Sequence, residues 1–338
     1  MMSDESPQSL SLPKRAFPHL TLIGALATIL AISLYSFGTI LGLFNFVLSR
    51  PYILTVVAEN LVWYSGIPLI VGLFLIAFDL LFLLENKRDK SPVRFDVVNT
   101  DSVTVCLTAY NDEESIALAV KDFLSHPKVA RVIVVDNNSK DRTSEFAKEA
   151  GAIVVLEEKP GYGQCVYRCY LEGIKYSDTE LTLLCEGDMT FRAFDIDKFL
   201  AYIPHADIVN GTRIVEQLRE FSTQLTSFMY YGNFAVGKLL ELIHLGKGTF
   251  TDVGTTYKLC RNDALRKILP YLDPEINLEF NAYFMDSVLT LNHVIVECPV
   301  TFSPRIGLSK GGNVNDIRAL KVGLRMIRGL LLGFKRYE

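Results

Sequence analysis

The chain has 338 residues, enough for one sizeable domain with additional segments. Hydrophobic residues make up 49% of it, which is high for a purely soluble protein, and they are concentrated near the N-terminus. The formal net charge is only −4, so the composition gives no sign of a general nucleic-acid-binding protein, and we expect no nucleic-acid partner. Six cysteines are present without a CxxC pair or a Cys/His spacing typical of metal sites, which favours buried free thiols in a reducing compartment.

The N-terminal region has the pattern of a membrane anchor. Residues 1–18 are polar, and we expect them to form a disordered cytoplasmic tail. Residues 19–48 are almost uncharged and long enough to cross a bilayer as a helix. A second apolar run covers residues 66–84. A cleaved signal peptide has a short apolar core followed by polar sequence, so this second run argues against one. Residues 19–90 are therefore predicted to contain two transmembrane helices.

Positive residues flank the outer ends of both apolar runs. Lys14 and Arg15 precede the first run, and Lys87, Arg88 and Lys90 follow the second. Because such flanks mark the cytoplasmic side, we expect an integral membrane hairpin with both termini and the globular domain in the cytoplasm. Asp79 lies within the second run, where a charge is costly unless it has a partner. A structural partner and a functional role are equally open for it.

After residue 101 the pattern changes to strands that alternate with helices. The expected strands cover residues 103–108, 131–136, 152–156, 181–185 and 207–210, and the expected helices cover 113–124, 139–150 and 163–174. This alternation predicts an α/β fold with a mostly parallel sheet and a ligand site beyond the carboxyl ends of its strands. No G-x-G-x-x-G opens the first helix, so a dinucleotide-binding domain is not expected.

Polar side chains follow three of these strands, and those after the fourth strand are the most informative. Glu186 and Asp188 are separated only by Gly187 and follow an apolar run. Two carboxylates this close repel each other and lose hydration unless a cation lies between them. Oxygen ligands suit Mg²⁺ or Mn²⁺, and a diphosphate would share the ion. An ordinary strand-to-loop turn with solvated acids is the alternative.

Seven segments, in order, resemble the motifs of family-two GT-A glycosyltransferases. Thr-Ala-Tyr-Asn-Asp-Glu at 108–113 resembles P-x-Y-N-E, and Glu-Gly-Asp at 186–188 stands where these enzymes carry D-x-D. The other segments are 136–143, 159–163, 210–213, 252–255 and 304–310. The resemblance identifies residues 101–312 as a GT-A catalytic domain, a nucleotide-diphospho-sugar transferase fold. Its last two segments are similar to the polyprenyl-phosphate branch, to which dolichol-phosphate mannose synthase belongs.

The resemblance assigns the nucleotide sugar, a UDP- or GDP-hexose, to the first four segments. The donor-binding residues that it implies are Tyr110, Asn111, Glu113, Asp136, Lys159, Gly161, Gly163, Glu186 and Gly187. Asp136 would accept a hydrogen bond from the base, with Asn111 and Glu113 on the same floor. Gly161 and Gly163, in the segment 159–163, would let the backbone approach the donor, and Lys159 would meet its phosphates. Helix capping is the alternative for Asn111, and an ordinary glycine-rich loop is the alternative for the segment 159–163.

The metal ion, Mg²⁺ or Mn²⁺, is implied to bind Asp188 directly and Glu186 directly or through water, and Thr190 would complete the site. The longer side chain of Glu186, compared with the family's Asp, leaves its mode of binding open. Arg213, Arg305 and Lys310 are candidates for the acceptor phosphate, because guanidinium groups grip phosphate in a bidentate manner. Surface charge is the alternative for these three.

The mechanism that follows is a single in-line displacement at the anomeric carbon, with inversion. A phosphate acceptor is already anionic near neutral pH and needs little help from a general base, which fits the position of all five histidines outside the motif segments. The metal would stabilise the departing nucleoside diphosphate. The expected catalytic residues are Asp188, Arg213 and Asp252, the last of which would position the acceptor or an arginine.

Two further segments have the composition of membrane-facing helices. Residues 221–245 are rich in aromatic and aliphatic side chains and suit either a membrane-lying helix or a buried packing helix. Near the C-terminus, apolar residues recur at spacings of three and four beside a row of basic ones. The apolar residues are Ile317, Leu320, Leu324, Ile327 and Leu331, and the basic residues are Arg318, Lys321, Arg325 and Arg328. This pattern predicts a basic amphipathic interfacial helix within residues 313–338, with a helix packed on the domain as the alternative.

The sequence thus favours a membrane glycosyltransferase that moves a hexose from a nucleotide sugar to dolichyl or undecaprenyl phosphate. A lipid hydroxyl acceptor, as in diacylglycerol or ceramide, is the first rival, with Asp252 as its base. A processive polysaccharide synthase would carry Q-x-x-R-W after the catalytic core, whereas the single tryptophan is Trp63. A catalytically degenerate membrane scaffold is the last rival, because Glu186 replaces an Asp and Asn137-Asn138 replace Asp-Gly.

Overall fold

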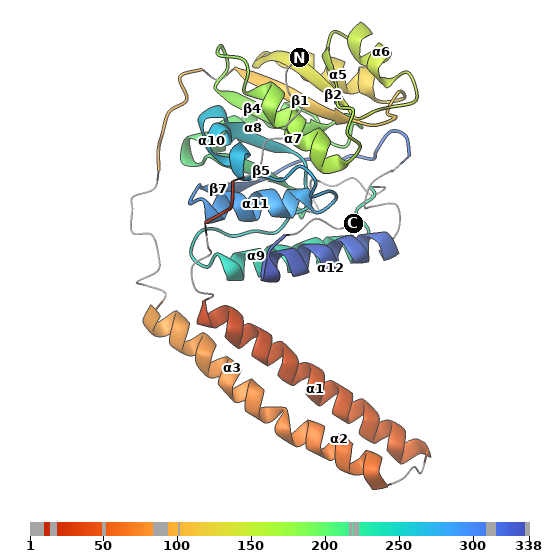
Figure 1. Cartoon of the computed structure of the whole chain (residues 1–338), viewed down its shortest axis with the longest axis vertical. Helices are drawn as coiled ribbons and strands as arrows, with labels where there is room; N and C mark the ends of the chain where they lie inside the picture. The colour runs from red at the N-terminus through yellow and green to blue at the C-terminus, as the bar shows by residue number, and fades with distance from the viewer. Residues whose placement is uncertain are drawn as a thin grey trace. The chain divides into compact units, whose positions relative to one another are not determined.

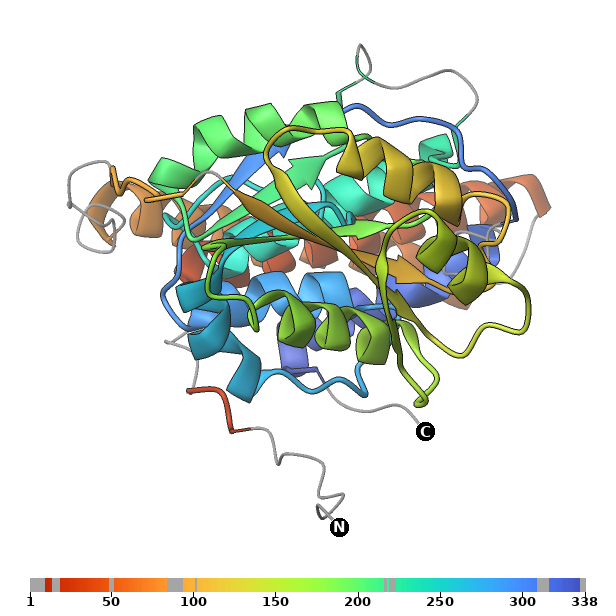
Figure 2. The same ribbon diagram turned by 90° about the horizontal axis from the view of Figure 1, so that it is seen from above.

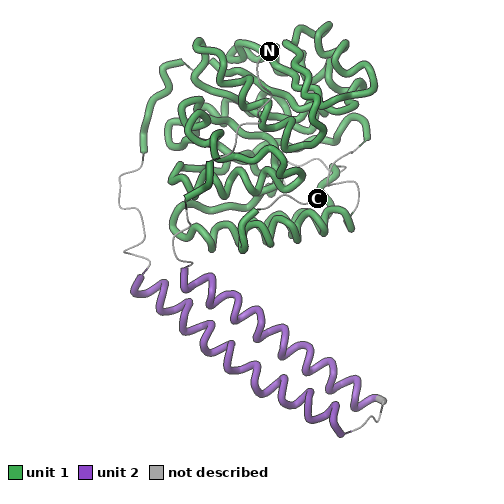
Figure 3. Tube along the Cα trace, in the orientation of Figure 1, with its two compact units in different colours: residues 1–14, 91–338 green, residues 15–90 purple. Residues whose placement is uncertain are grey.

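The computed structural model describes residues 10–13, 19–48, 52–83, 94–100, 102–215, 218, 223–308 and 316–334. The chain divides into two compact units (Figure 3). One unit, residues 15–90, is a helical hairpin, and the other, residues 1–14 and 91–338, is globular.

The hairpin consists of α1 (Leu20–Leu48), which packs against α2 (Tyr52–Tyr64) and α3 (Gly66–Phe78), and α3 continues into a π-helical turn, η1 (Asp79–Leu83). Two stretches are long and apolar enough to cross a membrane, Leu20–Val47 and Tyr52–Leu83. The second therefore begins before residue 66, because the segment around Trp63 is helical as well. Pro68 has no N–H to donate to the preceding turn, which explains the interruption of the helix at Ser65. The flanking basic residues lie outside the described residues.

Two contacts hold α1 against α3. A Cβ added to Gly24 would lie 2.5 Å from the carbonyl oxygen of Gly72, so glycine is required for this close approach. Asp79 is buried, and its carboxylate accepts hydrogen bonds from the backbone N (2.8 Å) and Oγ1 (2.9 Å) of Thr21 in the first turn of α1. Asp79 thus satisfies an otherwise unpaired helix N–H, and of the two roles open for it the structure supplies the structural partner.

The globular unit is built on a seven-stranded sheet with the order β3-β2-β1-β4-β6-β5-β7 (Figure 1). The strands are β1 (Val103–Ala109), β2 (Val129–Asp136), β3 (Ile153–Leu156), β4 (Leu181–Glu186), β5 (Ile208–Thr212), β6 (Lys258–Arg261) and β7 (Ile295–Pro299). The first four are mutually parallel and β7 is parallel to β5, but β6 is antiparallel to both of its neighbours. The α/β class is as predicted, whereas the sheet is mixed, and β6 and β7 have no counterpart among the expected strands.

Helices cover both faces of the sheet (Figure 2). One layer contains α5 (Ile116–Leu124), α6 (Thr143–Glu149) and α8 (Ile196–Tyr202), and the other contains α7 (Tyr162–Gly173), α10 (Asn262–Ile268) and α11 (Phe280–Thr290). Single 3₁₀ turns lie at η2 (Ala193–Asp195), η3 (Ile203–His205) and η5 (Leu269–Tyr271). Along β1, Val105 and Leu107 face the first layer and Cys106 faces the second, because successive side chains of a strand alternate. All six cysteines are buried and free, as expected.

Helices α9 (Ser227–Ile243) and α12 (Asp316–Leu332) pack against each other (Figure 1). The expected C-terminal helix is present, but a different stripe packs on the domain: Val322, Met326 and Leu330 are buried at spacings of four. Leu324 of the predicted apolar stripe is 56% exposed, so this stripe mostly faces outward. Helix α9 likewise buries one face and leaves aromatic side chains exposed, among them Tyr231.

Candidate active site

The polar segments that follow β1, β2 and β4 meet at one edge of the sheet. The three strands are parallel neighbours, and their register places Ala109 beside Asp136 and Thr108 beside Glu186. The carboxyl ends of these strands therefore lie together, as expected for an open α/β sheet. This edge collects the side chains that the sequence assigns to donor and metal.

Asp188 is buried at the centre of this edge. Its Oδ1 accepts hydrogen bonds from the backbone N (3.0 Å) and the Oγ1 (2.6 Å) of Thr190, and its own carbonyl accepts one from the N of Ile306 (3.1 Å). Gly187 precedes it, and a Cβ there would lie 2.5 Å from Cδ1 of Ile116, whose side chain would have to shift. The hydroxyl of Thr190 thus orients Asp188, and the prediction that Thr190 completes the metal site stays a prediction.

The electrostatics of this edge are dominated by crowded carboxylates. Burial and the negative charge of Glu186 raise the pKa of Asp188 to about 7, and the guanidinium of Arg305 opposes the rise. Nη2 of Arg305 lies 3.0 Å from Oδ2 of Asp188 and 3.9 Å from Oδ1 of Asp112. A cation at this edge therefore removes a repulsion that one arginine only partly compensates.

The metal-ligand atoms at this edge suit Mg²⁺ or Mn²⁺ shared with a diphosphate. Glu186 and Asp188 offer hard carboxylate oxygens, and over the described ranges no cluster of three or more His, Cys, Asp or Glu side chains is positioned to hold a metal by itself. Mg²⁺ sites commonly combine one or two carboxylates with substrate phosphates. The residues present are thus sufficient for a metal that arrives with a nucleotide, and they do not form an all-protein cage.

Asn111 and Glu113 both hold a neighbouring loop. Oδ1 of Asn111 accepts a hydrogen bond from the N of Lys140 (2.7 Å), and Oε2 of Glu113 accepts one from the N of Arg142 (3.0 Å). Both acceptors therefore satisfy backbone N–H groups just before α6, which begins at Thr143 and not at residue 139. The structural role of Asn111 is close to the capping alternative, and the place of both residues in the donor floor stays a prediction.

The carboxylate of Asp136 also binds groups of the loop that follows it and of α6. Its Oδ1 accepts a hydrogen bond from the N of Ser139 (2.9 Å), and its Oδ2 accepts one from the Oγ of Ser144. The next residue, Asn137, accepts a hydrogen bond from the N of Gly161 (2.8 Å) and donates one to the carbonyl of Lys159 (2.7 Å). Asn137 thus ties the segment 136–143 to the segment 159–163. Each oxygen of Asp136 accepts one hydrogen bond and keeps a further acceptor site, so the contact with a nucleotide base stays a prediction.

The two glycines of the segment 159–163, Gly161 and Gly163, have different roles. Gly161 has a φ of +137°, a conformation that favours glycine, and it lines the cavity described below. A Cβ on Gly163 would lie 1.8 Å from the carbonyl oxygen of Ile276, so this glycine permits close packing against another loop. The approach of the donor to Gly163 stays a prediction. Lys159 has an exposed side chain, and Tyr110 is 46% exposed at the cavity rim.

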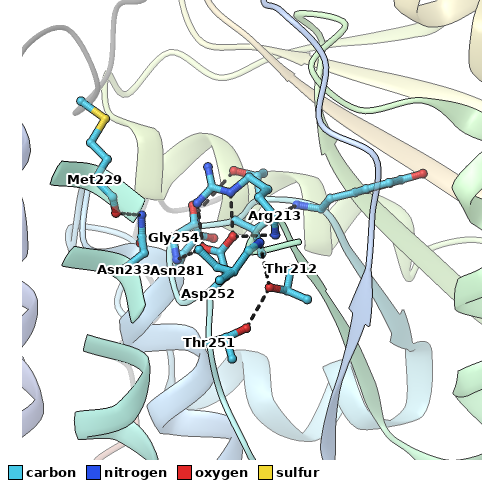
Figure 4. A network of polar contacts seen from close by, with 12 residues as sticks. Thr212, Arg213, Met229, Asn233, Thr251, Asp252, Gly254 and Asn281 are labelled. Atoms are coloured by element: carbon cyan, nitrogen blue, oxygen red, sulfur yellow. Dashed lines mark hydrogen bonds and ion pairs between the residues drawn. The ribbon is translucent and has the colours of Figure 1, made fainter. Parts of the chain in front are cut away.

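Arg213 and Asp252 form a buried ion pair (Figure 4). Nε and Nη2 of Arg213 lie 2.7 Å from Oδ2 and Oδ1 of Asp252, which also accepts hydrogen bonds from the backbone N of Arg213 (3.0 Å) and of Gly254 (3.1 Å). Burial opposes ionisation of Asp252, but Arg213 outweighs it and holds the pKa of Asp252 below its usual value. The Nε/Nη2 side of Arg213 is thus used by Asp252, whereas Arg213 also lines the cavity described below, and its contact with an acceptor phosphate stays a prediction.

A cavity of about 620 Å³ connects this edge to α9 and α12. Its polar end is lined by Tyr110, Asp112, Asn138, Lys140, Glu186 and Arg305. Its other end is lined by apolar side chains of the two helices, including Phe228, Val236, Val322, Leu324 and Ile327. Asn277 and Asn281 also line it, and no sequence motif marks them. Lys310, the third candidate for the acceptor phosphate, lies outside the described residues.

Comparison with known proteins places the chain in a family. Residues 104–269 match the model of Glycosyl transferase family 2. The chain belongs to glycosyltransferase family 2. The expected enzyme class is thereby confirmed, and the family-two domain includes the ends of β1, β2 and β4 that form the polar edge.

Two curated relatives and one solved structure illustrate the similarity. The chain is 37% identical over 114 residues to the uncharacterized glycosyltransferase Rv0539 of Mycobacterium tuberculosis, covering 33% of this chain and about half (49%) of that protein's length. It is 26% identical over 211 residues to a dolichyl-phosphate hexose transferase of Haloferax volcanii, covering 62% of this chain and 86% of that protein. A structure of glucosyl-3-phosphoglycerate synthase from M. tuberculosis, with Mn²⁺, UDP-glucose and phosphoglyceric acid, is 14% identical with a TM-score of 0.48, covering 69% of this chain and 80% of that one.

Proposed function

We propose that this protein transfers a hexose from a nucleotide diphosphate sugar, UDP- or GDP-linked, to a polyprenyl phosphate, with inversion and with Mg²⁺ or Mn²⁺. The observation that carries the proposal is the cavity, which is charged at the sheet edge and apolar between α9 and α12. A polyprenyl phosphate combines the same two chemistries, an anionic head and a long apolar chain. The named activity of the dolichyl-phosphate hexose transferase from H. volcanii supports this acceptor class.

The polar end supplies the groups that the reaction needs. Glu186 and Asp188 would hold the metal, which when bound neutralises the charge that develops on the departing nucleoside diphosphate. Arg305 lies 3.0 Å from Asp188 and lines the cavity, so it can pair with a phosphate once the metal takes over its carboxylate partner. The loops tied by Asn111 and Asp136 keep the nucleotide end of the cavity in shape.

The state of Asp252 favours a phosphate acceptor over a lipid hydroxyl. A hydroxyl must lose its proton during attack and needs a base, whereas a phosphate is anionic beforehand. Asp252 has no exposed surface, and both of its oxygens bind Arg213. A carboxylate that is paired in this way, with a lowered pKa, is a poor base. The rival reaction thus lacks the base that the sequence offered for it.

The outer surface of α9 and α12 suits a membrane interface. Exposed apolar side chains include Tyr231 on α9 and Ile317 and Leu324 on α12. The basic residues Lys321 and Arg328 of α12 are exposed as well. Apolar burial combined with attraction to anionic headgroups is the basis of interfacial helix binding. We further propose that the two apolar stretches of the hairpin anchor the protein, with both termini and the catalytic domain in the cytoplasm.

The test is a transfer assay with the full chain in detergent. UDP- and GDP-linked hexoses are each offered with Mn²⁺ to dolichyl phosphate, undecaprenyl phosphate, diacylglycerol and ceramide, and the lipid products are identified by mass. The expected product is a polyprenyl phosphate carrying one hexose. Transfer only to diacylglycerol or ceramide would reject the acceptor class. Absence of both transfer and donor hydrolysis would favour a non-catalytic scaffold.

A further inference from the structure

A chain of hydrogen bonds that none of the assigned roles uses ends on Glu186. Nδ2 of Asn281 donates to the hydroxyl of Tyr162 (2.8 Å), this hydroxyl lies 2.6 Å from Oγ1 of Thr256, and Oγ1 of Thr256 donates to Oε1 of Glu186 (2.7 Å). The three side chains come from separate parts of the fold: the start of α7, the segment before β6, and α11. Tyr162 and Asn281 line the cavity, and Thr256 and Asn281 are almost fully buried.

The number of available protons gives this chain one direction. Thr256 has a single hydroxyl proton, which goes to Glu186, so its oxygen must accept the proton of Tyr162. The oxygen of Tyr162 then accepts from the amide of Asn281. Oδ1 of Asn281 faces the donor Nζ of Lys258 (3.5 Å), which assigns the amide orientation independently. Every bond of the chain thus donates toward Glu186.

The far end of the chain is anchored to the buried ion pair. Nδ2 of Asn281 also donates to the carbonyl of Gly254 (3.2 Å), and the N of Gly254 donates to Asp252 (3.1 Å). Thr256 follows two residues later on the same segment and therefore has little freedom to move away. A glutamate has one more rotatable bond than an aspartate and loses more conformational entropy when it is fixed. The hydrogen-bond chain removes that freedom before any ligand arrives.

We infer that Thr256, oriented by Tyr162 and Asn281, is a positioning residue that fixes the carboxylate of Glu186 for metal binding. The hydrogen bond holds Oε1, and the carboxylate plane that results directs Oε2 to a defined side of the site. This role rests on the proposed function, because it concerns the metal that accompanies the donor. Hydrogen-bond partners of metal ligands typically change metal affinity 10–100-fold when they are removed.

The test measures Mn²⁺ affinity, by the spectroscopic signal of free Mn²⁺, for the full chain in detergent with UDP and, in a second arm, with GDP. Thr256→Val removes the hydroxyl at nearly constant volume and is expected to weaken Mn²⁺ binding about 10-fold. Thr256→Ser keeps the donor and is expected to stay close to wild type. Tyr162→Phe removes one link of the chain and is expected to lie between them.

The matched control is Thr104→Val. Thr104 is also a buried threonine with a bonded hydroxyl, 2.8 Å from that of Thr179, but it lies at the amino end of β1, away from the site. It is expected to leave Mn²⁺ affinity unchanged while undergoing the same chemical change. If Thr256→Val fails to fold, Thr256→Ser and Tyr162→Phe still decide the matter.

The outcomes separate the inference from the function beneath it. Wild-type affinity in Thr256→Val or in Tyr162→Phe, or a loss in Thr256→Ser as large as in Thr256→Val, would overturn the positioning role alone. A wild-type chain that binds no Mn²⁺ with either nucleotide would overturn the proposed metal-dependent function and the inference with it.

Discussion

The two halves of the active-site region hold their charged side chains in different ways. In the half formed by β1, β2 and β4, acceptor side chains bind backbone N–H groups of adjacent loops, as Asp136 does with Ser139. In the half that contains β5 and β6, charged side chains bind each other inside the core, as Arg213 does with Asp252. A substitution in the first half releases a loop that water can solvate, whereas one in the second leaves a buried charge without a partner.

Arg213→Met is expected to cause the largest loss of stability. It leaves Asp252 ionisable, fully buried and without its counter-charge, which typically costs about 3–5 kcal/mol. The measurement is the shift of the unfolding midpoint on heating, for the full chain in detergent. The matched control is Arg142→Met, because Arg142 pairs with Glu145 on the exposed surface of the other half. Equal midpoints for the two variants would contradict the comparison.

Asp188→Asn is expected to reduce transfer by a factor of about 100 to 1000, a range typical of losing one preorganised electrostatic contact to a transition state. The amide removes a negative charge that the metal needs and keeps the shape of the side chain. The unfolding midpoint should stay at the wild-type value or above, because the substitution also relieves the repulsion from Glu186. Full transfer activity in this variant would rule out the metal assignment.

Gly163→Ala is expected to destabilise the protein by about 1–3 kcal/mol, the usual cost of overpacking. The new methyl group would start 1.8 Å from the backbone carbonyl oxygen of Ile276, which cannot rotate away as a side chain could. Gly232→Ala is the control, because a Cβ at that position of α9 meets nothing within 4 Å. The control should be neutral or slightly stabilising in a helix. A midpoint for Gly163→Ala as high as for the control would contradict the packing role.

The same comparison explains how much the sequence predicts. The fold of the first half could be predicted because its strands and helices alternate along the chain and each motif directly follows a strand. The second half depends on pairings that are distant in sequence, such as the antiparallel pairing of Leu181 with Arg261. Motif reasoning found Arg213 and Asp252 and offered an arginine as one partner of Asp252, but it did not identify which arginine, since the sequence shows which groups are charged and not which of them meet. It missed Asn281 altogether, because a buried asparagine in a helix carries no signature.

Lys258 makes stability depend on pH in the second half. Burial lowers the pKa of Lys258 from 10.5 to about 7. Between pH 7 and 10.5 the unfolded chain binds a proton that the folded chain lacks, so stability rises with pH by up to about 1.4 kcal/mol per unit. Below pH 7 both states bind the proton and this slope disappears. Unfolding midpoints of wild type and Lys258→Met, compared from pH 6 to 10 in roughly single units, isolate the contribution; parallel curves would contradict it.

Leu324→Gln is expected to have the smallest effect, and it separates the two ends of the cavity. Leu324 is 56% exposed on α12 and lines the apolar end, so a polar replacement should weaken contact with a lipid chain by roughly 1 kcal/mol. This corresponds to an increase of about fivefold in the KM for polyprenyl phosphate. Leu118→Gln is the control, since Leu118 is 49% exposed on α5 in the other half and lies outside the cavity. The KM for the nucleotide sugar should change much less in both variants. An unchanged lipid KM in Leu324→Gln, or an equal rise in Leu118→Gln, would mean that the acceptor chain does not lie between α9 and α12.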